Sequence, residues 1–270
     1  MVVGILSRFG GGWESVLQNV PAQNEDCAEP KSNFGYNIEQ KYSRLATVFC
    51  KFHDKKRLDG AFDLCKNRDM QIENVVKNFE KRGFVAKFFK TPEEAVEFVS
   101  RTIGAGASVG IGGSVTVSEI GLYDVLAKNN KVYWHAAPDR DENTMRNAAD
   151  AQYYITSANA LSASGEIVNI DGRGNRVAAS IYGVNRKAVF FVCGINKLEE
   201  NLEKAMWRAK NIAAPKNAQR LGRKTPCAVK ADKCYNCQSP DKICCAYSII
   251  AHPTFSNPAY VIIIDAKLGY

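Results

Sequence analysis

The spacing of hydrophobic and polar residues predicts helices and strands in alternation along most of the chain. From Phe84 onward, short apolar runs of strand length are separated by stretches with helical spacing. The clearest helix start is Thr91-Pro92-Glu93-Glu94, where Thr91 can cap the helix and Glu94 can complete a capping box. Helices are expected at about Tyr42–Phe49, Ala61–Arg82, Pro92–Ile103, Val115–Lys128, Glu142–Ala149, Arg176–Tyr182 and Leu198–Ile212. Strands are expected at Phe84–Phe89, Ala107–Ile111, Val132–Trp134, Tyr153–Thr156, Ile167–Ile170, Ala188–Cys193, Tyr247–Ala251 and Tyr260–Ile264.

Strands that alternate with helices are typical of an α/β fold with a parallel, doubly wound sheet. Residues 1–36 show little periodicity and are rich in Gly, Asn, Gln and Pro, so we expect an N-terminal extension there. One α/β domain is expected over residues 37–270. It would begin with helices and carry a cysteine-rich loop, residues 227–245, near its end.

The composition is that of an ordinary globular protein, with 46% hydrophobic and 24% charged residues among 270. No apolar run approaches the roughly 18–20 residues that a membrane-spanning helix needs. The apolar start of the chain is too short for a secretory signal. We therefore expect a cytoplasmic protein without a membrane partner, in a compartment where thiols stay reduced.

Five of the nine cysteines lie in the run Cys227-x6-Cys234-x2-Cys237-x6-Cys244-Cys245. Four thiolates at these spacings predict a metal centre, either zinc or an iron–sulfur cluster (4Fe–4S), held by Cys227, Cys234, Cys237 and Cys244. Cys245 is then a bystander or a substitute ligand. The alternative is a set of reduced thiols that bind no metal.

The stretch that leads into these cysteines is strongly basic. Between Lys204 and Lys233 there are nine basic residues and one acid, Asp232, and nine minus one equals the formal net charge of the whole chain, +8. Such a segment would offset the charge of about −2 that four thiolates leave on zinc. It also raises nucleic-acid binding as a hypothesis. Only two aromatic residues, Trp207 and Tyr235, lie near these basic residues, and there is no recognition motif, which argues against that hypothesis.

A glycine-rich turn follows the strand expected at Ala107–Ile111. Its glycines would let the backbone approach an anion, and Ser114 and Thr116 could add hydroxyl donors at the start of the next helix. Glu119 would lie one turn further on, close enough to act as a general base. The alternative is an ordinary tight turn in which Ser114 only caps the helix. The predicted anion-binding residues of this turn are Gly112, Gly113, Ser114 and Thr116.

Two more polar groups follow expected strands, where ligands of parallel sheets usually bind. The first group combines amide side chains with Asp171, a second candidate base, although such residues in turns often satisfy only local backbone groups. The second group ends in Lys197, which either contacts an anion or is an ordinary solvated lysine. The three histidines show no catalytic or metal-binding spacing. The predicted ligand-binding residues of these groups are Asn159, Asn169, Asn175, Arg176 and Lys197.

Several of these motifs, in this order, resemble the lactate-utilisation (LUD) domain family. The resemblance extends from about Asn37 to Tyr270 and is strongest with the short, stand-alone members. Here Cys244-Cys245 replaces the usual single cysteine, which leaves the fourth ligand open. The segments that carry the resemblance are Gly110–Val117, Thr156–Ala160, Gly165–Ala179, Gly194–Lys197, Ala213–Gly222, the cysteine run and Leu268–Tyr270.

The resemblance implies a fold similar to ribose-5-phosphate isomerase, glucosamine-6-phosphate isomerase and CoA transferases. In that fold the glycine-rich loop binds phosphate or a related anion. The family is associated with lactate oxidation alongside iron–sulfur partner proteins, and it supplies no established catalytic residue. We therefore expect a lactate-utilisation-type protein that binds a phosphate- or carboxylate-bearing small molecule. The alternative is a non-catalytic, metal-bearing subunit of a redox complex, and assembly into an oligomer stays open.

Overall fold

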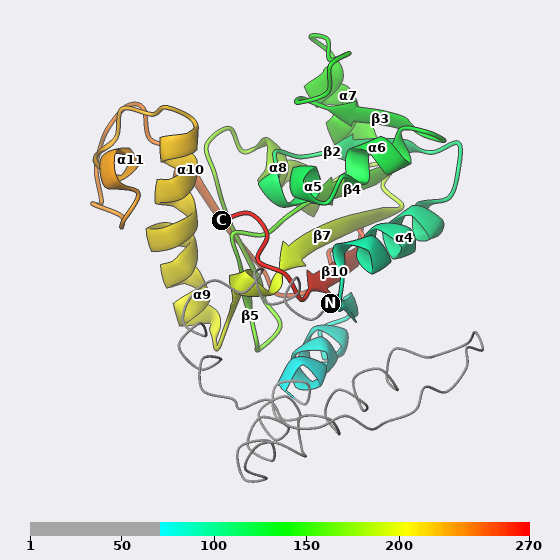
Figure 1. The fold of residues 1–270 in the computed structure, drawn as a ribbon, viewed down its shortest axis with the longest axis horizontal. Helices are drawn as coiled ribbons and strands as arrows, with labels where there is room; N and C mark the ends of the chain where they lie inside the picture. The colour runs from blue at the N-terminus through cyan, green and yellow to red at the C-terminus, as the bar shows by residue number, and fades with distance from the viewer. Residues whose placement is uncertain (1–70) are drawn as a thin grey trace, which may run out of the picture. The chain divides into compact units, whose positions relative to one another are not determined.

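A computed structural model of the chain describes residues 71–270, and its centre is a six-stranded parallel sheet (Figure 1). The strand order is β1-β10-β7-β4-β2-β3. This arrangement confirms the predicted α/β fold with a parallel sheet. The predicted extension 1–36 and the predicted helix from Tyr42 lie outside the described residues. The strands are β1 (Val85–Phe89), β2 (Ser108–Ile111), β3 (Lys131–Trp134), β4 (Tyr153–Thr156), β7 (Ala188–Gly194) and β10 (Ala259–Ile264).

The central strands are apolar on both faces because both faces of the sheet are covered. In β7 every residue is buried, and Val189 and Phe191 point to one face while Phe190 and Val192 point to the other. This alternation places two hydrophobic cores on opposite sides of the sheet. One core contains α4 (Pro92–Ile103), α5 (Val115–Glu119) and α6 (Leu122–Leu126). The other contains the helix over 71–81, α8 (Asn175–Ile181) and part of a second sheet.

Helix α4 begins as the sequence predicts. The Thr91 hydroxyl accepts from the Glu94 N–H at 3.3 Å, and a Glu94 carboxylate oxygen accepts from the Thr91 N–H at 3.3 Å. Pro92 occupies the first turn, where its missing N–H costs nothing. The capping box therefore satisfies two backbone donors that the helix cannot satisfy itself.

Two predicted strands do not belong to the parallel sheet. The strands expected at Ile167–Ile170 and Tyr247–Ala251 pair with each other, antiparallel, in a separate four-stranded sheet. The turn at Gly165, where φ is +97°, folds β6 back on β5, so the pair is antiparallel. Periodicity predicts a strand but not its partner, so it could not separate the sheets. The second sheet has the order β8-β5-β6-β9, formed by β5 (Ala160–Ser162), β6 (Ile167–Asp171), β8 (Leu198–Glu199) and β9 (Ala246–Ile250).

Two predicted helices are also interrupted. The helix expected at Val115–Lys128 is divided into α5 and α6 at Gly121, which has φ +65°. The helix expected from Leu198 begins instead at α9 (Leu202–Arg208), because Asn201 caps it and Leu198–Glu199 forms β8. It then widens into a π-helical turn at Ala209–Ala213 and continues as α10 (Ala214–Arg220). Pro215 has no N–H to donate to the preceding turn, which accounts for the wider turn.

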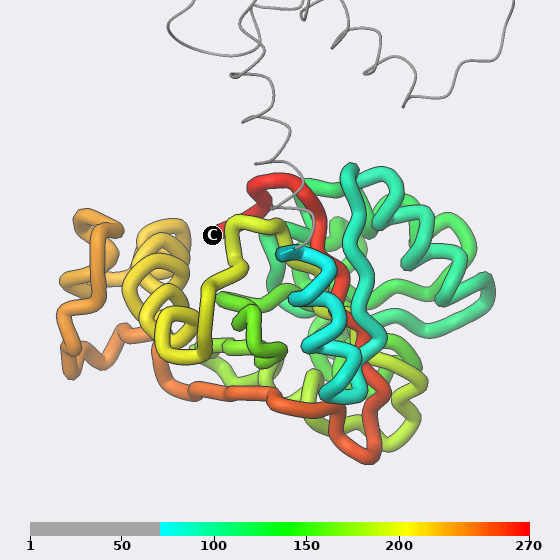
Figure 2. Tube along the Cα trace, turned by 90° about the horizontal axis from the view of Figure 1, so that it is seen from below, coloured from blue at the N-terminus to red at the C-terminus, as the bar shows by residue number. Residues whose placement is uncertain are grey.

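The remaining helices connect the sheets or lie in the cysteine-rich part of the chain, residues 227–245, which we call the cysteine segment. These are α7 (Thr144–Asp150), the 3-10 turn Ile195–Lys197 and α11 (Pro226–Lys230). The second sheet packs one face on the main sheet and the other on α9 and the π-helical turn. Figure 2 shows α9–α11 and the cysteine segment, in yellow and orange, on one side of the main sheet. Among residues 71–270, no helix is long and apolar enough to cross a membrane.

Candidate functional site

A cavity of about 680 Å³ opens where the main sheet meets the second sheet. Loops at the carboxyl ends of β2, β4 and β6 form much of its wall, with α10 and the cysteine segment on the opposite side. This is the edge at which ligands of parallel sheets bind. The structure therefore brings together most of the predicted ligand-binding residues. Those that line the cavity are Gly113, Ser114, Asn159, Asp171, Asn175, Arg176 and Lys197.

The glycine-rich turn is shaped by close packing as much as by ligand access. A Cβ on Gly112 would lie 2.6 Å from the Tyr154 hydroxyl, so this position has no room for a side chain and does not line the cavity. Gly113 lies in the wall, against the His135 ring. The Ser114 hydroxyl caps α5 by accepting from the Val117 N–H at 3.1 Å. Ser114 thus does what the plainer interpretation expected, while Gly113 lies where an anion could approach.

The turn nevertheless offers free donors. Within the described part of the chain, the backbone N–H groups of Gly113 and Ser114 have no acceptor. Helix α5 is only five residues long, so its dipole adds little to them. Any anion held there depends on the side-chain cations that surround the cavity.

A buried lysine forms part of the cavity wall. Lys197 is only 4% exposed, and its amino group donates to the Thr116 and Ser157 hydroxyls, at 2.8 Å in each case. Thr116 and Ser157 are themselves buried. We call these three residues the lysine cluster. Burial, reinforced by the positive charges of Arg208 and Arg176, lowers the pKa of Lys197 to about 8.

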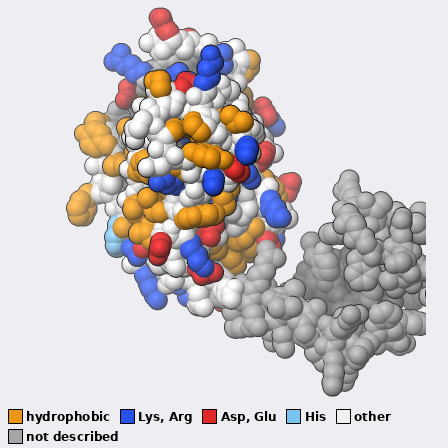
Figure 3. All heavy atoms as spheres, turned by 90° about the vertical axis from the view of Figure 1, so that its left-hand side faces the viewer, with side chains coloured by type: hydrophobic (Ala, Val, Ile, Leu, Met, Phe, Trp, Pro, Cys, Tyr) orange, Lys and Arg blue, Asp and Glu red, His pale blue; other side chains and the backbone are white. Residues whose placement is uncertain are grey.

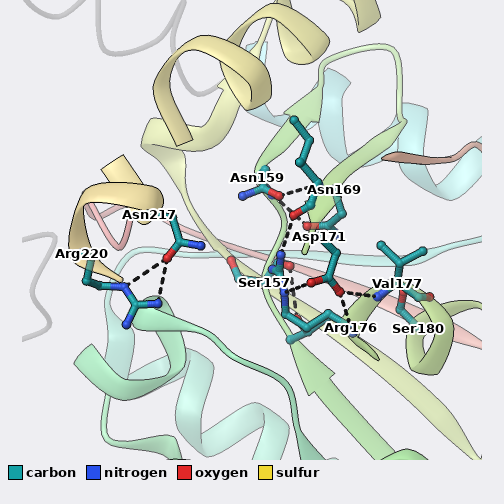
Figure 4. Close-up of polar contacts among 11 residues, drawn as sticks. Ser157, Asn159, Asn169, Asp171, Arg176, Val177, Ser180, Asn217 and Arg220 are labelled. Atoms are coloured by element: carbon teal, nitrogen blue, oxygen red, sulfur yellow. Dashed lines mark hydrogen bonds and ion pairs between the residues drawn. The ribbon is translucent and has the colours of Figure 1, made fainter. Parts of the chain in front are cut away.

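The predicted asparagines mainly hold the second sheet together. The Asn159 side-chain oxygen accepts from the Ile170 N–H at 2.7 Å, and the Asn169 oxygen accepts from the Asn159 N–H at 3.1 Å (Figure 4). Asn169 is 2% exposed and does not line the cavity. Asn159 does, so it serves the backbone and faces the ligand space.

The two predicted general bases lie in different places. Asp171 is in the cavity wall, where one carboxylate oxygen accepts from the Arg176 N–H at 2.8 Å and the Val177 N–H at 3.3 Å. It therefore secures the start of α8. Glu119 is outside the lining, and its carboxylate accepts from the Gly269 N–H at 2.7 Å. A base role for either carboxylate stays a prediction.

The structure adds cationic residues that sequence reasoning missed as site residues. Arg140, Arg173 and Arg220 line the cavity from the segment after β3, the turn after β6 and α10. His135 lies among them. Burial lowers the pKa of His135, and the charges of Arg140, Arg220, Arg173 and Arg176 lower it further. Arg220 belongs to the basic segment noted in the sequence, but its position across the cavity from Arg176 follows only from the fold (Figure 4).

The cysteine segment brings thiols near two tyrosines. Burial raises the pKa of Tyr247 to about 12, aided by the nearby Cys244, Cys234 and Cys245. Hydrogen bonds to Asp232 are the main cause that raises the pKa of Tyr235, and the nearby Cys227 raises it a little further. The predicted ligands are half-buried and unpaired. Within residues 71–270, no three His, Cys, Asp or Glu side chains are already arranged to hold a metal ion.

The side of the molecule that carries α9–α11 is mixed in character. Figure 3 shows hydrophobic side chains among basic and acidic ones on this face. The most exposed hydrophobic residues of these elements include Trp207 on α9 and Val229 on α11, at 59% and 78%. The cysteine segment therefore lies beside an apolar surface as well as a basic one.

Comparison with family models assigns the chain to a family. The family model of the LUD domain matches residues 72–264. A crystal structure of a DUF162 family protein from Deinococcus radiodurans is similar, with 12% sequence identity and a TM-score of 0.44. The similarity covers 73% of this chain and 98% of that chain. No curated protein matches the chain.

Proposed function

Because the chain belongs to the LUD domain family, we propose that it is a lactate-utilisation-type protein whose cavity binds an anionic small molecule. The ligand carries a phosphate or a carboxylate. A cytoplasmic location is part of the proposal, since a reducing compartment keeps free thiols such as the six described cysteines unpaired.

The observation that carries this proposal is a surplus of unpaired cations. Arg140, Arg173 and Arg220 line the cavity, and none of them makes an ion pair with any of the described residues. Arginine side chains from three separate elements repel one another when they face the same space. A bound anion would relieve that repulsion, and guanidinium groups match the planar geometry of carboxylates and the oxygens of phosphates.

The predicted residues divide into three roles in this proposal. Gly113 and Ser114 offer backbone N–H groups, while Asn175 and Arg176 face the ligand. Gly112, Asn159 and Asn169 keep the surrounding loops in shape. Lys197 lines the cavity, and the buried Thr116 holds its amino group from behind. Asp171 is the better placed of the two candidate bases, should turnover occur, because Glu119 lies outside the lining.

Titration calorimetry with inorganic phosphate and with lactate tests the anion site. Replacing Arg220→Gln should weaken binding about threefold to tenfold, the loss expected for one partly solvated ionic contact. The matched control is Arg101→Gln, because Arg101 is an exposed arginine on α4 and does not line the cavity. The anion site would be refuted if neither phosphate nor lactate binds, or if both variants lose the same affinity.

A metal centre is the second candidate function, in a subunit of a redox complex. The chemistry of the donor set fits zinc or a 4Fe–4S cluster, because four cysteine thiolates are common ligands of both. Cys227, Cys234, Cys237 and Cys244 would hold the group. Zinc would supply a structural cross-link, whereas a cluster would supply electron transfer to an iron–sulfur partner protein.

Anaerobic purification followed by metal analysis and an absorbance spectrum tests the centre. A cluster predicts absorbance near about 400 nm, and zinc predicts a colourless protein with one metal per chain. Cys234→Ser should abolish metal retention, while the matched Cys245→Ser should preserve it. A metal-free protein under anaerobic conditions would leave only reduced thiols.

A further inference from the structure

The lysine cluster has a reactive group that anion binding alone does not use. Lys197 is buried and has no carboxylate partner among the described residues. Within residues 71–270 its amino group donates only to two neutral hydroxyls, those of Thr116 and Ser157. A structural lysine is normally paired when it is buried. An unpaired, buried amine in the wall of a cavity calls for another explanation.

The parallel sheet explains why these three side chains meet. Thr116 follows β2, Ser157 follows β4, and Lys197 follows β7. These strands are neighbours in the sheet, in the order β7-β4-β2. Their carboxyl ends therefore converge, although Lys197 lies 81 positions from Thr116 and 40 from Ser157. Ser157 and Lys197 both line the cavity, so the amine is presented at the ligand space.

Burial is the main reason why Lys197 favours the neutral amine, and nearby charges act in both directions. Arg208 on α9 and Arg176 on α8 oppose its protonation, and the Cys193 thiol on β7 and Glu119 on α5 favour it. Glu119 is engaged with the Gly269 N–H, and burial outweighs both favourable groups. At pH 7 a pKa of about 8, against the ordinary 10.5, leaves roughly 300-fold more free amine than an ordinary lysine has. Desolvation and neighbouring cations are known means of activating lysine as a nucleophile.

We propose that Lys197 captures an aldehyde or ketone that carries a carboxylate or phosphate, by forming an imine with its carbonyl carbon. This inference rests on the anion site proposed above, because the cations of the cavity would orient the charged end of the substrate. The neutral amine attacks the carbonyl carbon, forming the C–N bond. The carbonyl oxygen then leaves as water, so one water is released for each imine and no oxidant or reductant is needed.

The neighbouring hydroxyls have a positioning role in this step. Ser157 and Thr116 hold the amine at one point in the wall, and a hydroxyl can pass a proton between the amine and the departing oxygen. Cys193 lies behind Ser157, with its sulfur 3.6 Å from the serine oxygen. The wall therefore keeps the amine aimed while the arginines hold the anionic group.

Pyridoxal phosphate is a suitable probe because it joins an aldehyde to a phosphate. Incubation with the full chain, reduction by borohydride and peptide mapping by mass spectrometry reveal which lysine carries the stable secondary amine. Lys197 should be the main site, and its labelling should exceed that by pyridoxal, which lacks the phosphate, about tenfold. The yield at Lys197 should rise around pH 8, whereas ordinary lysines gain reactivity only towards pH 10.

Lys197→Met should abolish the adduct, and Lys187→Met should not change it. Lys187 is an exposed lysine just before β7, at the opposite end of that strand. Even if Lys197→Met fails to fold, peptide mapping of the labelled wild-type chain shows whether Lys197 carries the adduct. Adducts spread over exposed lysines would overturn the proposal. If inorganic phosphate binds but no adduct forms at Lys197, the proposal of imine formation is refuted and the proposed anion site is still supported. If phosphate also fails to bind, the anion site and imine formation at Lys197 are both refuted.

Discussion

The lysine cluster and the cysteine segment both gather reactive side chains, but in opposite physical settings. Lys197, Thr116 and Ser157 are each less than 5% exposed and follow strands of the parallel sheet. Cys227, Cys234, Cys237 and Cys244 are half-buried; the first lies in the five-residue helix α11 and the other three in the loop that follows it. The sheet positions the lysine cluster before any ligand arrives. The cysteine segment has no such scaffold, so its thiols would come into coordination only when a metal pays the entropic cost of bringing them together.

The two regions nevertheless share the cavity. Asp241 and Lys242, from the cysteine segment, line the rim opposite the glycine-rich turn. The Asp241 carboxylate accepts from the Lys224 N–H at 2.6 Å and pairs with Arg223 at 3.1 Å. A metal centre in this segment would therefore fix one wall of the ligand site. This arrangement could couple metal loading to anion affinity.

The largest expected difference is in how much stability a Gly→Ala substitution costs in the parallel sheet and beside the cysteine segment. A Cβ at Gly110, in β2, would lie 2.0 Å from the Ala148 carbonyl oxygen, and backbone cannot move aside easily. Gly110→Ala should lower the free energy of unfolding by about 3 kcal/mol or more. Gly222, beside the cysteine segment, has open space and φ +62°, so Gly222→Ala should cost only about 1 kcal/mol. Urea unfolding measures both, and equal losses would contradict the contrast between sheet and segment.

A smaller effect should follow from the charge of Lys197. Its folded-state pKa, about 8, lies below the ordinary 10.5, so the unfolded chain binds more protons between these values. Stability should therefore rise with pH in this window. Between pH 7.5 and 9.5 the wild type should gain about 2 kcal/mol relative to Lys197→Met. Urea unfolding at the two pH values measures this gain. If the free energy of unfolding changed equally with pH in the wild type and in Lys197→Met, the amine would not be buried as described.

The smallest effect should come from the shared rim. Asp241→Asn removes a negative charge that faces the cavity and releases Arg223 from its ion pair. Phosphate should then bind more tightly, because one repulsive charge is gone. The gain should be only a few-fold, because solvent screens charges at the rim. Titration calorimetry measures this change. Asp124→Asn on α6, outside the lining, is the matched control and should leave the affinity as it was.

Much of the local structure could be predicted from sequence because its causes are local. Thr91 and Glu94 lie three positions apart, so the capping box is visible in the chain itself. The apolar runs of β7 and β10 also identify buried strands. The same patterns could not show that Gly121 divides a helix, or that β6 and β9 form another sheet. The second of these outcomes depends on partner strands that are distant in sequence.

The candidate site shows the same division. By itself the sequence indicated the parallel α/β fold, the glycine-rich turn and the polar residues at strand ends, because the spacing of residues carries these signals. Its motifs also resembled one family. Only the tertiary structure decided that Asp171 holds the start of α8 and that Glu119 lies outside the cavity. It also decided that Lys197 meets two hydroxyls, 40 and 81 positions away. The physical reason is that strand order, which no local pattern encodes, determines which strand ends become neighbours and which charges are removed from water.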